Sequence, residues 1–383
     1  MTRLVILTEI ISPYRIPLFN ALARDASLDL HVIFLAETDP NLRQWRVYKE
    51  EIKFSHEVLP SWRRRVFSYN FLLNHGVVRA LDAASPDAIL CGGYSYVASW
   101  RALGWARSHN IPLLLWSESN LQDQRRGHLL VEYLKAEFLR RCDAFVVPGR
   151  SAFEYLRANK VKEQRIFTAP NAVDNDLFAA AVAAIRKDAV VARRKLNLPS
   201  RYFLFVGRLV REKGVFDLLS AYAKLDERMR QEIGVVFVGD GEVRKQLEAQ
   251  ASSISPGTIR FSGFVHRDEL AAYYALADVL VLPTYTDTWG LVVNEAMACG
   301  LPVILSRAAG CGPDLVKEGW NGVLIAPQDV SSLASAMARL ASQPELSAAM
   351  GAHSAQHISR YSPQEWSRGI VGAVRATLGA RDS

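Results

Sequence analysis

The sequence predicts an α/β protein built from two doubly wound domains, each with a parallel sheet covered by helices on both faces. Two observations lead to this prediction. Short apolar, β-rich runs alternate with stretches whose apolar residues recur at three- and four-residue spacing, and such alternation favours parallel sheets. The chain also has 383 residues, more than the roughly 250–300 at which single cores stop growing.

The strands fall into two series separated by helical stretches. The first series is expected at residues 3–9, 29–37, 87–93, 111–118 and 143–149. The second is expected at residues 202–207, 234–240, 258–264, 278–284 and 301–306. Because the strand and helix pattern restarts near residue 202, we expect a second sheet rather than a continuation of the first.

We therefore predict four segments. An N-terminal domain covers residues 1–178, and a linker rich in Ala and charged residues covers 179–200. A C-terminal domain covers residues 201–358. In the last segment, 359–383, Pro363 is placed to start a helix that returns to the first domain.

Composition excludes several classes of protein. Half of the residues are hydrophobic, which excludes a disordered chain, and no apolar run approaches the length of a transmembrane helix. Glu9 interrupts the apolar N-terminus, so we expect no signal peptide. Four widely spaced cysteines suit neither a disulfide framework nor a zinc site. We expect a cytoplasmic protein.

The formal net charge of +7 favours acidic partners. Residues 44–54 and 61–73 interleave Trp, Tyr and Phe with Arg and Lys, and the basic region from Arg43 to Arg65 would suit an anionic lipid surface. We therefore expect peripheral contact with a membrane. The alternative is a solvated helix face over an ordinary core. Nucleic acid is not expected, because no recognised binding module accompanies this region.

Residues that follow the strands of the second series are the first candidates for a site, because ligands of open α/β sheets bind at the carboxyl ends of the strands. After the strand at 202–207 comes GRLVREKG, which places Arg208 and Lys213 on a loop leading into a helix. Both side chains suit phosphate oxygens. The alternative is a pair of solvated surface cations.

A second candidate segment, TYTDTWGLVVNEAMACGLPVI, covers residues 284–304. Asp287 precedes a predicted helix and Glu295 lies about one turn inside it, so both carboxylates are expected to face one ligand. The amides of Gly290 and Leu291 at the helix start are expected to bind phosphate. The alternative is that Asp287 caps the helix and Glu295 is an ordinary surface carboxylate.

These two motifs, with GDGE at 239–242, FSGFV at 261–265 and AGCGPDLVKEGWNGVLIAPQD further on, resemble the family-4 retaining glycosyltransferases of the GT-B fold in order and spacing. The resemblance covers most of residues 165–335. It implies two Rossmann-like domains facing across a cleft. It also implies transfer of a sugar, with retention, from a nucleoside-diphosphate sugar held by the C-terminal domain to a saccharide or lipid-linked saccharide in cell-surface polysaccharide or glycolipid synthesis.

The resemblance also implies residue roles in the C-terminal domain. Arg208 and Lys213 bind the diphosphate, Glu295 accepts hydrogen bonds from ribose hydroxyls, and Asp287 contacts the donor sugar. Asp287 stands where the family more often has Glu, so the identity of the donor sugar is less readily carried over from the family to this chain. The other expected donor-binding residues are Gly207 and Gly239, Phe264 and Val265 beside the base, and Gly290 and Leu291 at the distal phosphate.

In the N-terminal domain the strand at 111–118 ends near Glu118, where many members of the family have a His beside the donor sugar. Glu118 is a candidate replacement, or else it pairs with Arg125 or Arg126. Tyr14 and Arg15, on the first strand-exit loop, are expected to bind an anionic acceptor group, although Tyr14 packing beneath the loop is an equal alternative.

No cofactor is expected beyond the donor substrate, and no essential metal. The acidic run from Asp174 to Asp176 resembles a metal-binding DxD signature, but its interdomain position favours turn chemistry. Alternative functions are a nucleotide-sugar epimerase or hydrolase of the same fold, or a non-catalytic sugar-nucleotide-binding protein. The sequence leaves the oligomeric state open.

Overall fold

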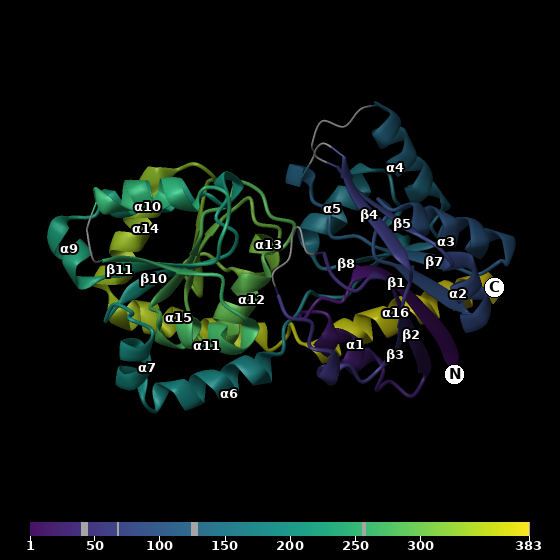
Figure 1. Cartoon of the computed structure of the whole chain (residues 1–383), viewed down its shortest axis with the longest axis horizontal. Helices are drawn as coiled ribbons and strands as arrows, with labels where there is room; N and C mark the ends of the chain where they lie inside the picture. Colours follow the sequence, from purple (N-terminus) through teal and green to yellow (C-terminus); the bar gives the residue numbers. More distant parts are fainter. Residues whose placement is uncertain (40–44, 67–68, 124–128, 255–257, 383) are drawn as a thin grey trace. The chain divides into compact units, whose positions relative to one another are not determined.

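The computed structural model describes residues 1–39, 45–66, 69–123, 129–254 and 258–382. The chain divides into two units. The first comprises Met1–Ala172 together with the C-terminal residues from Pro363, and the second comprises Val173–Ser362. In Figure 1 the yellow C-terminal helix accordingly lies among the purple and blue elements of the first unit.

The first unit contains a seven-stranded parallel sheet in the order β3-β2-β1-β6-β7-β8-β9. Its strands are β1 Thr2–Ile10, β2 Leu28–Ala36, β3 Ser55–Val58, β6 Ala88–Cys91, β7 Leu113–Trp116, β8 Ala144–Val147 and β9 Ile166–Thr168. Successive side chains of a strand point to opposite faces, and in β1 both sets are buried: Leu4 and Ile6 join one core cluster, Val5 and Leu7 the other. This two-sided burial explains the continuous apolar run.

Helices cover both faces of this sheet. They are α1 Ile16–Leu22, α2 Val77–Ala84, α3 Val97–Ser108, α4 Leu129–Arg141, α5 Arg150–Ala158 and α16 Pro363–Asp382. Helix α16 begins at the proline expected to start it, and its fully buried Trp366 packs against Phe19 of α1 and Trp116 of β7.

A separate antiparallel pair, β4 Ser61–Val66 and β5 Tyr69–Asn74, occupies most of the basic and aromatic stretch at 61–73. The alternative of a solvated helix face is therefore wrong for these strands. The side chain of Arg63 and the opposite Leu72 are largely buried, whereas Trp62 and the opposite Leu73 are exposed. The pair thus has one inner and one outer face.

The second unit contains a six-stranded parallel sheet in the order β12-β11-β10-β13-β14-β15. Its strands are β10 Tyr202–Val206, β11 Gly234–Val238, β12 Ile259–Gly263, β13 Val279–Leu282, β14 Val303–Ser306 and β15 Gly322–Ile325. The chain runs outward from β10 to β12 and then returns to the other side of β10 as β13. The switch point between β10 and β13 is where ligands of such sheets bind.

The helices of the second unit are α6 Asn175–Arg186, α7 Ala189–Lys195, α8 Val215–Ala223, α9 Glu227–Glu232, α10 Arg244–Ser252, α11 Arg267–Leu276, α12 Leu291–Ala298, α13 Gly312–Leu315, α14 Val330–Ser342 and α15 Pro344–Ile358. Residues 179–200, set apart above as a linker, thus lie largely in α6 and α7 and group with this unit. In the described chain, no helix is long and apolar enough to cross a membrane.

Candidate functional site

Two loops at the switch point of the second sheet are held against each other. The loop after β10 passes through Lys213, and the loop after β13 leads to Asp287. The Tyr285 amide donates to the Glu212 carbonyl oxygen over 2.8 Å, and the Thr284 hydroxyl donates to the same oxygen over 3.0 Å. These bonds place the predicted phosphate-binding loop beside the predicted sugar-binding carboxylate.

Lys213 and Asp287 form an ion pair, and both side chains are largely buried, with 18% and 16% of their surfaces exposed. Arg208, in contrast, is exposed and forms no ion pair with any residue that the structure describes. One loop therefore offers an available guanidinium and an ammonium that already neutralises a carboxylate. The negative charge of a diphosphate would be attracted by Arg208 and by Lys213.

The start of α12 has the features expected of an anion-binding helix end. Gly290, with φ of 101°, is its N-cap, and no side chain in the described part of the chain caps the helix. The amides of a first turn have no partner within the helix, so those near Gly290 and Leu291 are oriented to meet an anion. Asp287 lies three residues upstream and approaches the Trp289 amide at 3.4 Å.

Glu295 lies on the inner side of α12 and is fully buried. Tyr274 of α11 donates a hydrogen bond to its Oε2 over 2.6 Å, while Oε1 has no hydrogen-bond partner among the described residues. Burial raises the pKa of this carboxyl to about 7, against the opposing effects of the Tyr274 hydroxyl and Arg267. The surface-carboxylate alternative is therefore wrong, and contact with ribose stays a prediction.

The remaining predicted donor residues follow neighbouring strands. Gly239, after β11, donates through its amide to the Gly263 carbonyl over 2.7 Å, and it leaves no room for a Cβ beside the Gly207 carbonyl. Phe264 and Val265 follow β12, and the ring of Phe264 is exposed. The structure therefore brings the exits of β10, β11 and β12 to one edge.

In the first unit the predicted acceptor-side residues also meet. Arg15, after β1, pairs with Glu118, after β7, over 3.3 Å, and its guanidinium lies 3.8 Å from the ring centroid of Trp116. Tyr14 makes an edge contact with Trp45 at 5.9 Å. Glu118 is thus already paired; Arg125 and Arg126, its predicted partners, lie outside the described residues.

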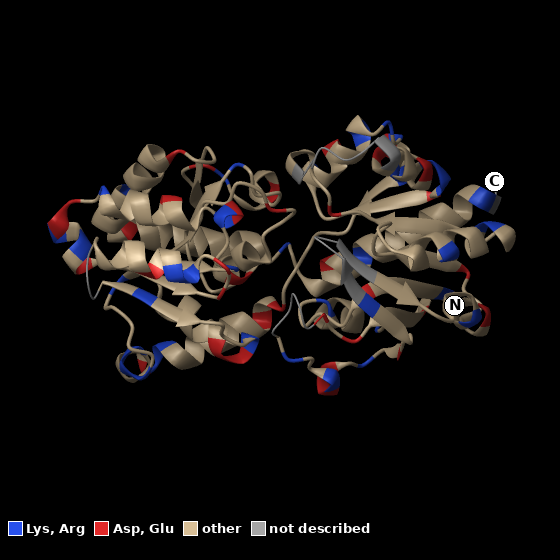
Figure 2. Ribbon diagram, turned by 45° about the horizontal axis from the view of Figure 1, so that its top comes forward, with Lys and Arg blue, Asp and Glu red and all other residues tan. Residues whose placement is uncertain are grey.

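The basic residues near the start of the chain are largely neutralised. Arg63 pairs with Glu9 and with the nearly buried Asp39. Arg46 pairs with Glu50 over 2.8 Å, and Lys49 with Glu37 over 2.7 Å. Arg43 lies outside the described residues. Figure 2 shows Lys and Arg spread over both units and interspersed with Asp and Glu. Whether a given cation is available to bind a ligand therefore depends on whether it already forms an ion pair.

Sequence reasoning missed several polar partners. Tyr96, before α3, hydrogen-bonds the carboxylate of Glu9, and Tyr285 hydrogen-bonds Asp217 of α8. Tyr274 was missed because a tyrosine at a buried helical position looks like any other core aromatic. The acidic run at 174–176 caps α6, since the Asp174 side chain accepts from the Leu177 amide over 3.0 Å. Within the described ranges, no cluster of three metal-ligating side chains occurs.

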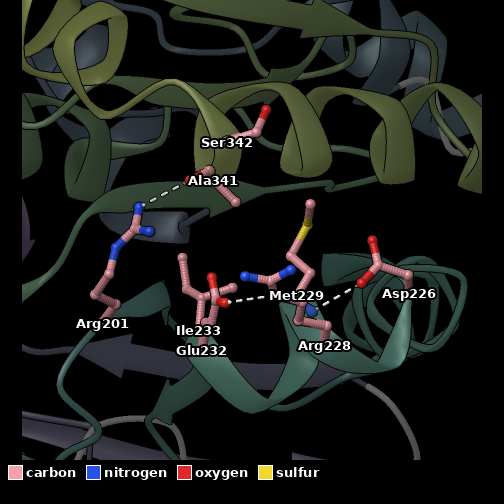
Figure 3. A pocket seen from close by; sticks show the side chains of 8 residues that line it. All are labelled: Arg201, Asp226, Arg228, Met229, Glu232, Ile233, Ala341 and Ser342. Carbon is pink, nitrogen blue, oxygen red and sulfur yellow. Dashed lines mark hydrogen bonds and ion pairs between the residues drawn. The ribbon is translucent and has the colours of Figure 1, made fainter.

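A pocket of about 210 Å³ in the second unit lies at the opposite edge of the sheet (Figure 3). Arg201 precedes β10 and Ile233 precedes β11, so the pocket is at the amino ends of the strands. Its charged groups are already engaged: Arg201 pairs with Asp278, Arg228 with Glu232, and Asp226 caps α9. It therefore does not belong to the candidate site.

Comparison with known proteins gives two family matches. Residues 187–357 match the glycosyl transferases group 1, and residues 18–177 match glycosyltransferase family 4. Curated relatives include D-inositol 3-phosphate glycosyltransferases of Corynebacterium jeikeium, 37% identical over 45% of this chain and 43% of the relative, and of Geodermatophilus obscurus, 31% identical over 57% and 48%. The chain thus spans about half the length of these relatives.

Solved structures resemble the whole chain. HepE of Anabaena, solved with UDP, has a TM-score of 0.77 at 17% identity and covers 98% of this chain and 100% of its own. Sucrose-phosphate synthase of Thermosynechococcus elongatus has a TM-score of 0.75 at 21% identity, covering 99% and 100%. At these identities the likeness shows the fold, and the predicted GT-B fold of two doubly wound domains is confirmed.

Proposed function

We propose that this chain, which its two family matches place among the family-4 glycosyltransferases, transfers a sugar from a nucleoside-diphosphate sugar to an acceptor hydroxyl with retention at the anomeric carbon. The observation that carries the proposal is the ion pair of Lys213 and Asp287 at the switch point of the second sheet, beside Arg208, which has no ion pair with a described residue. Lys213 and Asp287 offset each other, so the positive charge of Arg208 remains, and a diphosphate supplies negative charge to meet it.

Each side chain of the site has a distinct part in the transfer. As the bond between the sugar and the diphosphate breaks, negative charge grows on the leaving oxygen. Arg208, Lys213 and the amides at the start of α12 stabilise that charge, which is the largest contribution in many enzymes. Asp287, held by Lys213, accepts hydrogen bonds from the sugar hydroxyls and so orients the anomeric carbon.

We propose that the reaction needs no metal ion and no further cofactor. Arg208, the N-terminus of α12 and Lys213, whose charge is shared with Asp287, together offer a diphosphate the positive charge that a metal ion would otherwise supply. Activity is therefore expected to survive excess EDTA and to be unaffected by added Mg²⁺ or Mn²⁺. Loss of turnover in EDTA, with recovery on adding either ion, would contradict this part of the proposal.

The donor is proposed to be a UDP-sugar, since HepE was solved with UDP and with UDP-glucose. A thermal-shift panel of UDP-, GDP- and ADP-sugars tests the choice, because a ligand that binds only the folded state raises its stability. The largest shift is expected for a UDP-sugar. An equal or larger thermal shift with a GDP- or ADP-sugar would contradict the choice of uracil as the base of the donor.

The acceptor is proposed to be a saccharide or a lipid-linked saccharide of cell-surface polysaccharide or glycolipid synthesis, in the cytoplasm. The curated relatives are named for inositol 3-phosphate. In this chain, however, Glu118 neutralises Arg15, the cation predicted to bind an anionic acceptor group. An uncharged sugar hydroxyl therefore suits this edge of the first sheet better than a phosphate.

Lys213→Ala tests the assignment of the donor site. A hydrogen bond to a charged group contributes about 1.5–3 kcal/mol, so turnover with labelled donor is expected to fall about 10- to 100-fold. Lys224→Ala, which removes an exposed lysine from the end of α8, is the matched control and is expected to keep wild-type turnover. Wild-type turnover in Lys213→Ala would refute the role of Lys213.

Product analysis separates the alternatives. A transferase moves the label to the acceptor, an epimerase or hydrolase of the same fold releases altered or free sugar, and a non-catalytic binding protein leaves the donor intact. The configuration of the new linkage, read by NMR, tests retention directly. An inverted product would contradict the proposed stereochemistry while leaving the transferase assignment in place.

A further inference from the structure

A pocket of about 310 Å³ lies in the first unit. Six residues line it: Trp62, Leu73, Asn74, His75, Val97 and Arg101. They come from β4, from β5 and the residue after it, and from α3. We infer that this pocket binds the phosphate-proximal part of a lipid-linked acceptor, with the apolar chain against Trp62 and the phosphate at Arg101.

The apolar wall consists of three large side chains that are unusually exposed. Trp62, Leu73 and Val97 have 50%, 39% and 48% of their surfaces accessible. Trp62 and Leu73 are directly opposite each other in the β4–β5 pair, so their side chains share one face. Single exposed apolar residues are ordinary, but three that line one pocket indicate a binding surface.

The polar side of the pocket carries a cation, Arg101, that pairs with no carboxylate among the described residues. Arg101 lies one turn after Val97 on the same face of α3, and it donates to the Asn74 carbonyl oxygen over 3.3 Å. It forms no ion pair with a residue that the structure describes, whereas Arg15 and Arg63 each pair with carboxylates. A guanidinium beside an apolar wall suits the phosphate of an amphiphile.

A buried acceptor atom gives independent support. Asn74 has 6% of its surface exposed, and its Nδ2 donates to the Leu35 carbonyl over 2.5 Å. Its Oδ1 has no hydrogen-bond partner among the described residues. Buried polar atoms without a partner are rare in native proteins. Asn74 thus brings an unsatisfied acceptor to a residue that lines the pocket.

Two residues of the pocket are chain neighbours of residues that contact Glu9 near the end of β1. Val97 follows Tyr96, which hydrogen-bonds Glu9 at the end of β1. Trp62 precedes Arg63, which pairs with the same Glu9. Glycan and lipid parts of one acceptor would therefore meet neighbouring surfaces. This inference rests on the proposed function, and it narrows the expected lipid contact from the whole basic region between Arg43 and Arg65 to Trp62 of that region and the other residues of the pocket.

Binding of a monomeric lipid phosphate tests the inference without any donor present. Isothermal titration of the whole chain uses farnesyl phosphate, farnesol and inorganic phosphate, all below micelle-forming concentrations. Farnesyl phosphate is expected to bind, farnesol to bind at least tenfold more weakly, and inorganic phosphate to give no measurable heat. Trp62→Ala and Arg101→Ala are each expected to weaken farnesyl phosphate binding at least tenfold.

Matched variants control for these changes. Trp62→Phe keeps the apolar wall and is expected to retain affinity, while any lipid-dependent change in Trp62 fluorescence disappears. Val190→Ala, at an exposed apolar residue of the second unit, and Arg228→Ala, at an arginine with 90% of its side chain exposed, are expected to bind as the wild type does.

Equal affinity of Trp62→Ala, Arg101→Ala and wild type would overturn the inference, as would binding to anionic vesicles without binding to the monomer. A separate UDP-sugar thermal shift and transfer assay distinguishes failure of the pocket from failure of the proposed function. Lipid binding without sugar transfer would retain the pocket and refute the transferase.

Discussion

At the scale of single residues, the carboxyl of Glu295 differs most from its sequence-based expectation, because it is buried although its position in the helix indicated exposure. A carboxyl one turn inside a helix usually reaches solvent. Here it is fully buried and has the Tyr274 hydroxyl as a hydrogen-bond donor. Burial disfavours the charged form more than the Tyr274 hydroxyl and Arg267 favour it, and the pKa of this carboxyl rises to about 7. Its protonation is therefore coupled to folding near neutral pH.

Stability is expected to fall as pH rises from about 4.5 to 7, because the folded state binds a proton at Glu295 that the unfolded state has already released. Above pH 7 the loss amounts to about 3 kcal/mol. Glu295→Gln keeps an acceptor for Tyr274 and removes the titration, so it is expected to be more stable than wild type at pH 8 and similar at pH 4.5. Urea unfolding at both pH values measures this; identical pH dependence in the two proteins would contradict the assigned pKa.

At the scale of elements, backbone contact between loops decides the geometry of the donor site. Gly214, the N-cap of α8, has φ of 67°, and a Cβ built on it would lie 2.0 Å from the Pro283 carbonyl oxygen. The loop that carries Lys213 therefore reaches the loop that leads to Asp287 only because residue 214 has no side chain. The lack of a side chain at Gly214 thus allows Lys213 to come close to Asp287.

Gly214→Ala is expected to lower the free energy of unfolding by about 1–3 kcal/mol, the usual cost of backbone strain, and to abolish the UDP-sugar thermal shift. Gly104→Ala is the matched control, because Gly104 lies inside α3 and a Cβ built on it meets no described atom within 4 Å outside its own helix backbone. That change is expected to stabilise the protein by about 0.5–1 kcal/mol. Comparable stability of the two variants would refute the argument.

At the scale of the whole molecule, the C-terminal helix completes the first unit after the chain has formed the second. Trp366 of α16 is fully buried and lies 5.1 Å from Trp116, whose ring also supports Arg15. Gly369 lies so close to the Thr168 carbonyl that a Cβ would come within 2.4 Å. The two units are therefore interleaved in sequence, although each has its own sheet.

Trp366→Ala is expected to destabilise the first unit by about 3–5 kcal/mol, the usual cost of removing a buried tryptophan. Amide hydrogen exchange is expected to accelerate in β1, β7 and α1 and to stay unchanged in β10 and β13. Trp320→Ala, in the second unit, where Trp320 stacks on His353 at 4.6 Å, is expected to give the reverse pattern. Uniform acceleration throughout the chain in both variants would contradict this assignment.

The sequence predicted ten strands whose positions are confirmed. Nine of them lie inside a sheet, where strands buried on both faces appear as continuous apolar runs, and the tenth, β12, is an edge strand. It missed β3, β9 and the β4–β5 pair. The first two are edge strands, which are short and partly polar, and the pair has apolar and charged residues mixed on a half-exposed surface. It also missed β15, although residues 322–325 are apolar.

The sequence by itself determined the fold class, the resemblance to a family and the positions of Arg208, Lys213, Asp287 and Glu118, since periodicity and motif spacing are local properties of a chain. Only the tertiary structure decided which charges are paired. Lys213 meets Asp287 across two strand exits, Glu118 takes Arg15, and Arg101 keeps no carboxylate among the described residues. The physical reason is that the charged state and the ion pairs of a side chain depend on its burial and on neighbours that are far away in the sequence.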